Sequence, residues 1–84
     1  MKENHFRIMA IKMVRILEDD RDNKLDIYIA WLCKVLQNNK AVIFVPNGRH
    51  TLYEVTYNGD TGEFYADAYN KIENRVMTFE EVGA

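Results

Sequence analysis

The sequence contains no serine, a single cysteine and two histidines. The missing serine excludes a serine nucleophile, and the lone Cys33 excludes both an internal disulfide and a zinc site built on several cysteines. His5 and His50 lack the close spacing of paired metal ligands, so we predict neither a metal site nor a cofactor. These absences leave few routes to catalysis.

Long apolar runs are also missing. No segment approaches the ~20 apolar residues that a membrane-spanning helix needs. No signal peptide precedes the first predicted helix. We therefore expect a cytoplasmic protein without a membrane partner.

The chain has little net charge. It carries 11 Lys and Arg against 13 Asp and Glu, a net charge of −2. Residues 1–40 hold eight basic and six acidic side chains, whereas residues 41–84 hold three and seven. The acidic second half argues against direct binding of nucleic acid, which relies on a basic surface.

Length and composition predict one compact domain over residues 1–84. With 48% hydrophobic and 29% charged residues, the chain belongs to the globular class and can form one modest core. We expect an α+β fold. In it, an N-terminal helical hairpin (residues 1–39) packs on one face of a three- or four-stranded antiparallel β-meander (residues 40–84).

The clearest element is a β-hairpin over residues 51–69. Two segments of alternating character flank the loop GDTG at 59–62, which lacks the Lys and the following helix of a phosphate-binding loop and is read as a turn. The loop length predicts three cross-strand pairs on the buried face: Tyr57 with Phe64, Val55 with Ala66 and Tyr53 with Ala68.

Two helices are predicted before the sheet, over residues 3–18 and 24–38, from apolar spacings of three and four. The stripe of the first is Phe6, Met9, Ala10, Met13, Ile16 and Leu17. The second is capped by Asn23. Its stripe is Leu25, Tyr28, Ile29, Leu32, Cys33, Val35 and Leu36, which places Cys33 in the core. Four residues outside the stripes form a predicted secondary surface: Ile8, Ile11, Ile27 and Trp31.

The acidic segment between these helices does not form a calcium loop. An EF-hand needs Gly at its sixth position and a bidentate Glu at its twelfth. Counting from Asp19 or from Asp20 places neither residue there. We interpret residues 18–22 as a solvated loop.

Residues 40–45 predict a strand that is apolar on both faces. A loop over residues 46–48 pairs Ile43 with Thr51 and leaves Val42 and Phe44 on the face away from the helices. An even-numbered loop would expose Ile43 instead. After residue 69, two alternatives stay open: a turn at 73–74 into a fourth strand at 75–79, or a short helix capped by Thr78.

One catalytic alternative is a small metal-independent ribonuclease. Such enzymes place His, Arg, Tyr and Glu across a sheet, and here Arg49 and His50 would carry the reaction, with Tyr53, Glu54 and Arg75 nearby. An enzyme that holds RNA usually presents a basic surface, whereas the sheet half of this chain is acidic. The composition therefore favours a protein without catalytic activity.

A helical hairpin can cover one face of a meander and leaves the other exposed. We predict that this second face binds a protein partner through Val42, Phe44, Leu52, Glu54, Tyr65, Asp67 and Tyr69. Tyrosines mixed with carboxylates suit a partner that offers Arg or Lys. The alternative occupant is a second copy, giving a homodimer. Small size and acidity are also typical of inhibitors encoded by phages or mobile elements, including anti-defence and anti-CRISPR proteins.

Overall fold

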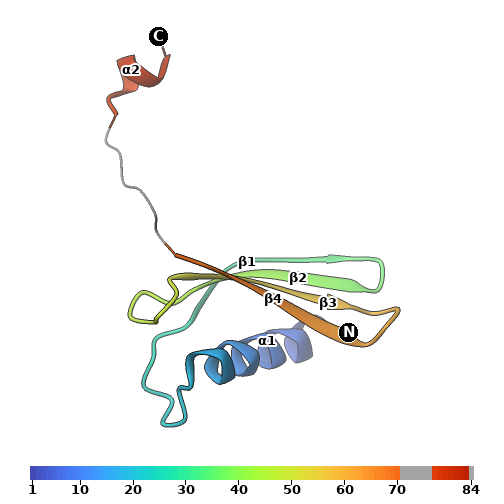
Figure 1. The fold of residues 1–84 in the computed structure, drawn as a ribbon. Coiled ribbons are helices and arrows are strands. Elements are labelled where there is room, and N and C mark those ends of the chain that lie inside the picture. Colours follow the sequence, from blue (N-terminus) through green and yellow to red (C-terminus); the bar gives the residue numbers. More distant parts are fainter. Residues whose placement is uncertain (71–76, 84) are drawn as a thin grey trace.

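In the computed structural model, one long helix lies across one face of a four-stranded antiparallel sheet (Figure 1). The structure describes residues 1–70 and 77–83. The elements in chain order are α1 (Glu3–Glu18), β1 (Tyr28–Val35), β2 (Asn38–Phe44), β3 (Leu52–Asn58), β4 (Glu63–Tyr69) and α2 (Phe79–Gly83). The strands are neighbours in sequence order, so the α+β class with an antiparallel meander is confirmed.

The core lies between α1 and the side of the sheet that α1 covers, which we call the inner face. Its fully buried members are Phe6, Ala10 and Val14 of α1 with Ala41, Ile43, Val45, Tyr53 and Val55 of the sheet and its loop. Phe64 of β4 stacks on Phe6 with ring centroids 6.3 Å apart. Burying one side chain of Val, Ile or Phe size contributes about 1.5–3 kcal/mol, so this cluster dominates the stability of the fold.

Helix α1 has its predicted range, but its buried face differs from the predicted stripe. Phe6, Ala10 and Val14 recur at a spacing of four. Ile16 is 77% exposed and Leu17 is also exposed, so their assignment to the buried stripe is wrong. In the last turn the buried side chain belongs to Glu18.

The predicted second helix over residues 24–38, and with it the helical hairpin over residues 1–39, is wrong. Residues 28–35 form the edge strand β1, which turns back through Leu36 and Gln37 into β2. Apolar side chains are almost continuous in this stretch, so a helical period and a strand period both fit it. Its β-branched and aromatic residues favour the strand, because such side chains pack well on a pleated surface.

A nearly buried carboxylate holds the segment between α1 and β1 in place. Asp20 accepts hydrogen bonds from the backbone N–H groups of Lys24 and Leu25 at 2.9 and 3.1 Å. Arg15 pairs with Asp20 at 2.5 Å and donates to the carbonyl oxygen of Leu25 at 3.2 Å. Asp20, which follows the end of α1, therefore fixes the chain at Lys24 and Leu25, just before β1 begins.

Leu36 holds the turn between β1 and β2 in an unusual conformation. Its φ is 56°, in the left-handed region that costs most residues roughly 1–2 kcal/mol. Two-residue hairpin turns ordinarily place Gly or Asn there. The missing turn residue is one reason why the sequence did not indicate a hairpin at 36–37.

Replacing Leu36 with Asn is expected to stabilise the protein by about 0.5–1 kcal/mol, because Asn tolerates positive φ. Leu36 is 82% exposed, so little burial is lost. Urea unfolding of the wild type and Leu36→Asn measures the change. Leu36→Ala, which keeps the strain, serves as the control and should shift stability far less. A destabilised Leu36→Asn would contradict the left-handed turn.

The two hairpins after β1 keep their predicted faces. All three predicted pairs between β3 and β4 are present. Strand β2 is shifted by two residues, so that Ile43 lies opposite Tyr53 rather than Thr51. A hydrogen bond from Val45 N to Thr51 O, 2.9 Å long, closes a loop over residues 46–50, longer than predicted. Because side chains alternate with a period of two, the shift moves no residue to the other face.

The described part of the predicted strand at 75–79, residues 77–79, does not form a strand, and the short helix α2 begins at Phe79. The Thr78 hydroxyl accepts a hydrogen bond from the backbone N–H of Glu81 at 3.2 Å, as the predicted cap requires. The predicted turn at 73–74, and Arg75, lie outside the described residues. Phe79 is 94% exposed, so α2 adds nothing to the core.

Glu18 connects the end of α1 to the loop between β2 and β3. Its carboxylate is 8% exposed and accepts hydrogen bonds from the backbone N–H groups of Arg49 at 2.6 Å and His50 at 3.1 Å. The buried Tyr53 hydroxyl donates a third. At Gly48 a Cβ would lie 2.8 Å from a Glu18 oxygen, so the loop needs glycine at this close approach.

Burial raises the pKa of the Glu18 carboxyl, but its three hydrogen bonds and the charge of Arg49 lower it more, and the net pKa lies below its ordinary value of 4.5. Burial and the neighbouring Glu18 carboxylate raise the pKa of the Tyr53 hydroxyl. Both directions keep Glu18 ionised and Tyr53 protonated at neutral pH, which is the state that forms their hydrogen bond.

Glu18→Gln should destabilise the fold at pH 7 by about 1–3 kcal/mol, because an amide cannot accept all three hydrogen bonds. The folded pKa is depressed, so the contribution of the carboxylate is complete above pH 4.5 and is lost as the pH falls through the folded value. Urea unfolding of both proteins between pH 3 and pH 8 measures the difference between their free energies of unfolding. This difference should become smaller as the pH falls. The control is Glu3→Gln, at an exposed carboxylate of α1. A difference in free energy of unfolding that becomes larger in acid would contradict a stabilising role of the ionised Glu18 carboxylate.

Candidate functional site

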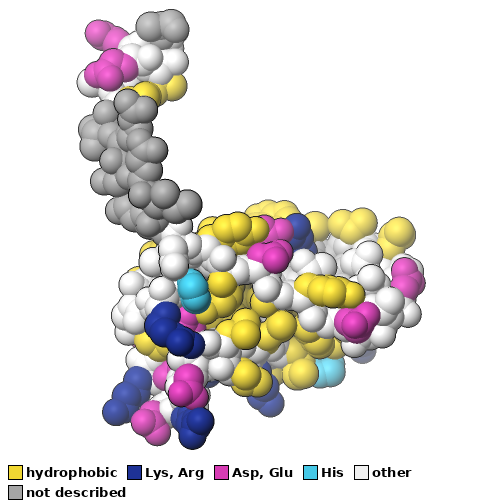
Figure 2. Space-filling model, viewed as in Figure 1, with side chains coloured by type: hydrophobic (Ala, Val, Ile, Leu, Met, Phe, Trp, Pro, Cys, Tyr) yellow, Lys and Arg dark blue, Asp and Glu magenta, His cyan; other side chains and the backbone are white. Residues whose placement is uncertain are grey.

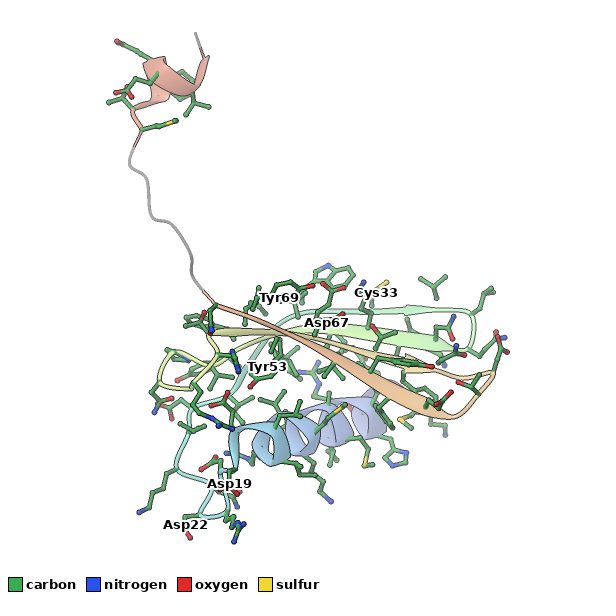
Figure 3. The ribbon with its side chains drawn as sticks, viewed as in Figure 1. Asp19, Asp22, Cys33, Tyr53, Asp67 and Tyr69 are labelled. Carbon is green, nitrogen blue, oxygen red and sulfur yellow. The ribbon has the colours of Figure 1, made fainter. Side chains whose placement is uncertain are left out.

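The outer face of the sheet, opposite α1, presents three cross-strand rows of side chains. Residues paired across neighbouring strands point to the same face. From β1 to β4 the rows are Tyr28, Phe44, Leu52 and Tyr69; Trp31, Val42, Glu54 and Asp67; and Cys33, Lys40, Thr56 and Tyr65. Figure 3 shows Cys33, Asp67 and Tyr69 on this side of the sheet and Tyr53 on the side of α1.

The structure brings all seven predicted binding residues together on this face, namely Val42, Phe44, Leu52, Glu54, Tyr65, Asp67 and Tyr69. The predicted secondary surface is divided. Trp31 lies on the outer face opposite Val42, whereas Ile8 is exposed on α1. Ile11 is half-buried and Ile27 packs against the core. These four residues therefore do not form one surface.

The outer face is apolar, aromatic and exposed. Its large side chains, with Val35 two residues beyond Cys33 on β1 added to the rows, keep between 36% and 61% of their surface accessible: Val35, Tyr28, Trp31, Tyr65, Tyr69, Phe44 and Leu52. Figure 2 shows hydrophobic side chains along this side of the sheet with acidic and basic ones among them. Single exposed apolar residues are common on proteins, but a contiguous set of this kind marks a site of association.

Sequence reasoning missed what β1 contributes to the outer face. Cys33 was expected in the core and lies instead on the outer face, half-buried, because β1 is a strand. Trp31, Cys33 and Val35 recur with a period of two, and this is the signal that could have identified the strand. Together with Lys40 and Thr56, these residues line part of a shallow depression of about 210 Å³.

Charge on the outer face is partly compensated. Lys40 forms an ion pair with Glu54. The hydrogen bond and the charge of Glu54 raise the pKa of Lys40, with a smaller contribution from Asp67. Asp67 lies directly opposite Glu54 and has no ion-pair partner among residues 1–70 and 77–83. The face therefore offers one carboxylate, flanked by Tyr65 and Tyr69, to a cation from outside.

The residues of the ribonuclease alternative hold the fold together in this structure. The Arg49 side chain donates to the carbonyl oxygen of Leu17 at 2.7 Å. A ring nitrogen of His50 lies 3.0 Å from the side-chain oxygen of Asn70, and the ring contacts Tyr53 edge-on. Both side chains thus join the loop before β3 to neighbouring elements, and neither lies in the outer-face rows.

Two further site types receive no support from the described residues. No group of three or more His, Cys, Asp or Glu side chains in residues 1–70 and 77–83 is arranged to hold a metal ion. Neither helix of this part of the chain combines the length and apolar character that crossing a membrane requires.

Residues 5–79 match the model of a family of unknown function (DUF6275). The chain belongs to this family. No curated protein and no solved structure matches it. The DUF6275 region includes all four strands, and therefore every residue of the outer-face rows.

Cys33 should react with a thiol reagent in the folded protein, because it lies on the outer face of an edge strand. We expect modification at a rate independent of the unfolding rate, measured with a chromogenic disulfide in native buffer. Val55→Cys in a Cys33→Ala background provides a buried control, since Val55 is fully buried. A wild-type thiol that reacts as slowly as the control would contradict the position of β1.

Proposed function

We propose that this chain is a non-enzymatic binding protein whose outer sheet face engages a protein partner that carries Lys or Arg. The observation that supports this most directly is the row of exposed aromatic and apolar side chains on a face without a helix in the described part of the chain. Four strands ~4.8 Å apart and seven residues rising ~3.3 Å each give a face on the order of 450 Å² in projection. Patches of this size on a monomer are often functional.

The composition of the face favours a protein ligand with cationic groups. Tyr and Trp supply contact area together with a hydrogen-bonding tip, and they dominate the energetics of many interfaces. Asp67 has Tyr65 and Tyr69 two residues away on the same face. A guanidinium or ammonium group placed there would meet a carboxylate and the faces of two rings.

The same charges make self-association a weaker alternative. Two outer faces packed together would bring Glu54 and Asp67 of both copies into one interface with Lys40 as the compensating cation of each. Each copy would then bury an uncompensated carboxylate, which is costly. A homodimer remains an outcome of the experiments below. An inhibitor of the phage-encoded or anti-CRISPR type is one form of the proposed function, supported by small size and acidity alone.

Affinity capture from the native host, with the full chain as bait, tests the proposal. We expect the wild type and Ile8→Ala to retain one common partner, because Ile8 lies on α1 away from the outer face. The double variant Tyr65→Ala/Tyr69→Ala should lose it. With the purified partner, that variant should bind at least about tenfold more weakly. Both tyrosines are about half exposed, so the thermal midpoint should stay close to that of the wild type.

Two further measurements complete the test: the dependence of binding on ionic strength and the oligomeric state of the protein. Asp67→Asn should weaken binding and flatten its dependence on ionic strength, since the carboxylate is the unpaired charge of the face. Retention of the partner by the double variant would refute the outer-face site. Sedimentation that shows a micromolar dimer, dissolved by the same two alanines, would replace the heterologous partner with a second copy.

A further inference from the structure

The two edges of the sheet differ in how open they are to another strand. A β-bulge between Ile29 and Trp31 interrupts β1, which also carries Lys34. Bulges and lysines are common devices that discourage strand addition. Strand β4 pairs continuously with β3 over residues 63–69 and contains no Lys, Arg or Pro. Within the described residues nothing pairs with its free side, so alternate backbone N–H and C=O groups there point outward.

On the inner face, α1 leaves room beside β4. The helix lies against β2 and β3, and Ala68 of β4 is exposed although it faces the helix side. A groove of about 300 Å³ follows this side of α1, lined by Met9, Lys12, Met13, Ile16 and Phe64. A strand added to β4 would direct every second side chain toward this groove.

On the outer face, β4 presents the unpaired carboxylate. Tyr65, Asp67 and Tyr69 alternate along the strand and point to the same side. The Tyr65 hydroxyl donates to Glu63 at 3.1 Å at the start of the strand, and Asp67, between the two tyrosines, is the carboxylate placed to receive an incoming cation. Opposite charges that face each other across a strand pair stabilise it, and a cation here would also contact the tyrosine rings.

We propose that β4 accepts an extended segment of the protein partner as a fifth strand. Lys or Arg of that segment faces Asp67 on the outer side, and apolar residues alternate with it toward the groove beside α1. This inference rests on the proposed function, because Tyr65, Asp67 and Tyr69 belong to the outer face. It adds a backbone contact and an alternating basic and apolar pattern for the ligand.

Two acidic elements among the described residues, β4 of a second copy and α2, fit the free edge less well than a basic strand. A second β4 would bring its own Glu63 and Asp67 and no cation, so that four carboxylates would line one strand pair. Helix α2 carries Glu80 and Glu81 and is acidic as well. Compared with these two acidic elements, charge complementarity favours a basic segment of the partner.

A set of synthetic peptides tests the strand addition with the full chain. The parent probe is acetyl-Thr-Val-Arg-Ile-Arg-Val-Thr-amide, titrated by NMR at low salt. We expect amide shifts concentrated at residues 63–69. Replacing both arginines of the probe with glutamate should weaken binding at least about tenfold. Equal affinity for the acidic peptide would overturn the proposal.

N-methylated probes distinguish backbone pairing from a side-chain contact. One form carries N-methyl groups on its two arginines and the other on its two valines, which lie on opposite edges of an extended peptide. One form should bind at least about tenfold more weakly than the parent, and the other within about threefold of it. If both forms bind like the parent, or both are lost, the fifth strand is refuted.

Variants of the protein supply the matched controls. Asp67→Lys should reverse the preference, so that the glutamate peptide binds better than the arginine peptide. Ile16→Asp, at an exposed position of the groove, should weaken the parent probe. Ile8→Ala, at an exposed position of α1 outside both the outer-face rows and the groove, should leave the affinity for the parent probe within about threefold of the wild-type value. An Ile8→Ala loss as large as that of Asp67→Lys would overturn the edge site.

The two proposals can fail separately. Suppose that partner capture requires Tyr65 and Tyr69 but that N-methylation does not change peptide binding. The outer-face site would then stand, and the fifth strand would be refuted. The proposed function would be refuted if the peptides bind at the β4 edge while the Tyr65→Ala/Tyr69→Ala variant still captures the partner. A dimer in sedimentation that Asp67→Ala strengthens would show that a second copy occupies the edge, and would overturn the choice of a foreign segment.

Discussion

The hydrogen bonds of Glu18 decide which part of the sheet the helix can cover. The carboxylate closes α1 and is held by two loop amides and by Tyr53, which points inward from β3. A buried carboxylate without these partners would be costly, so the end of α1 cannot move away without losing all three bonds together. Near the other end, Phe6 stacks on Phe64. The helix is thus fixed along the inner face over β2 and β3.

The fixed position of α1 determines which parts of the sheet stay exposed. A helix is about 10 Å wide and four strands span more than that, so α1 covers the middle of one face and leaves both the β4 flank and the whole outer face. Strand β3 shows the division residue by residue. Tyr53 and Val55 are buried, while Leu52 and Glu54 between and beside them stay accessible. One set of side chains stabilises the fold and the alternate set is free for recognition.

The outer face could be predicted from sequence because side chains alternate between the two faces of a strand. A residue keeps its face whenever the register changes by an even number of residues. The loop GDTG set the pairing of β3 and β4 correctly, and the two-residue shift of β2 kept Val42 and Phe44 on their expected side. The inner side of α1 could not be predicted in full. The last buried position holds Glu18, and no hydrophobic periodicity can identify a carboxylate that is buried through long-range partners.

The helix predicted at 24–38 failed for a different reason. Apolar residues on both sides of β1 leave the period ambiguous, and Leu36 occupies a left-handed turn without Gly or Asn. Asp20 binds the backbone N–H groups of Lys24 and Leu25 and so fixes the segment that leads from α1 into β1. Because β1 was missed, so was the outer-face position of Cys33.

The position of the unpaired carboxylate connects the outer face to the free edge. Lys40 compensates Glu54 in the interior of the face, where an isolated charge would oppose the burial of the surrounding aromatic side chains. Asp67 lies one strand further out, at the edge of the sheet. Its carboxylate stays hydrated there and loses this hydration only when a bound cation displaces the water. A ligand that approached the centre of the face would meet a closed ion pair. One that lies along β4 would meet the open carboxylate, two tyrosines and a row of free backbone groups, and this difference directs recognition to the edge.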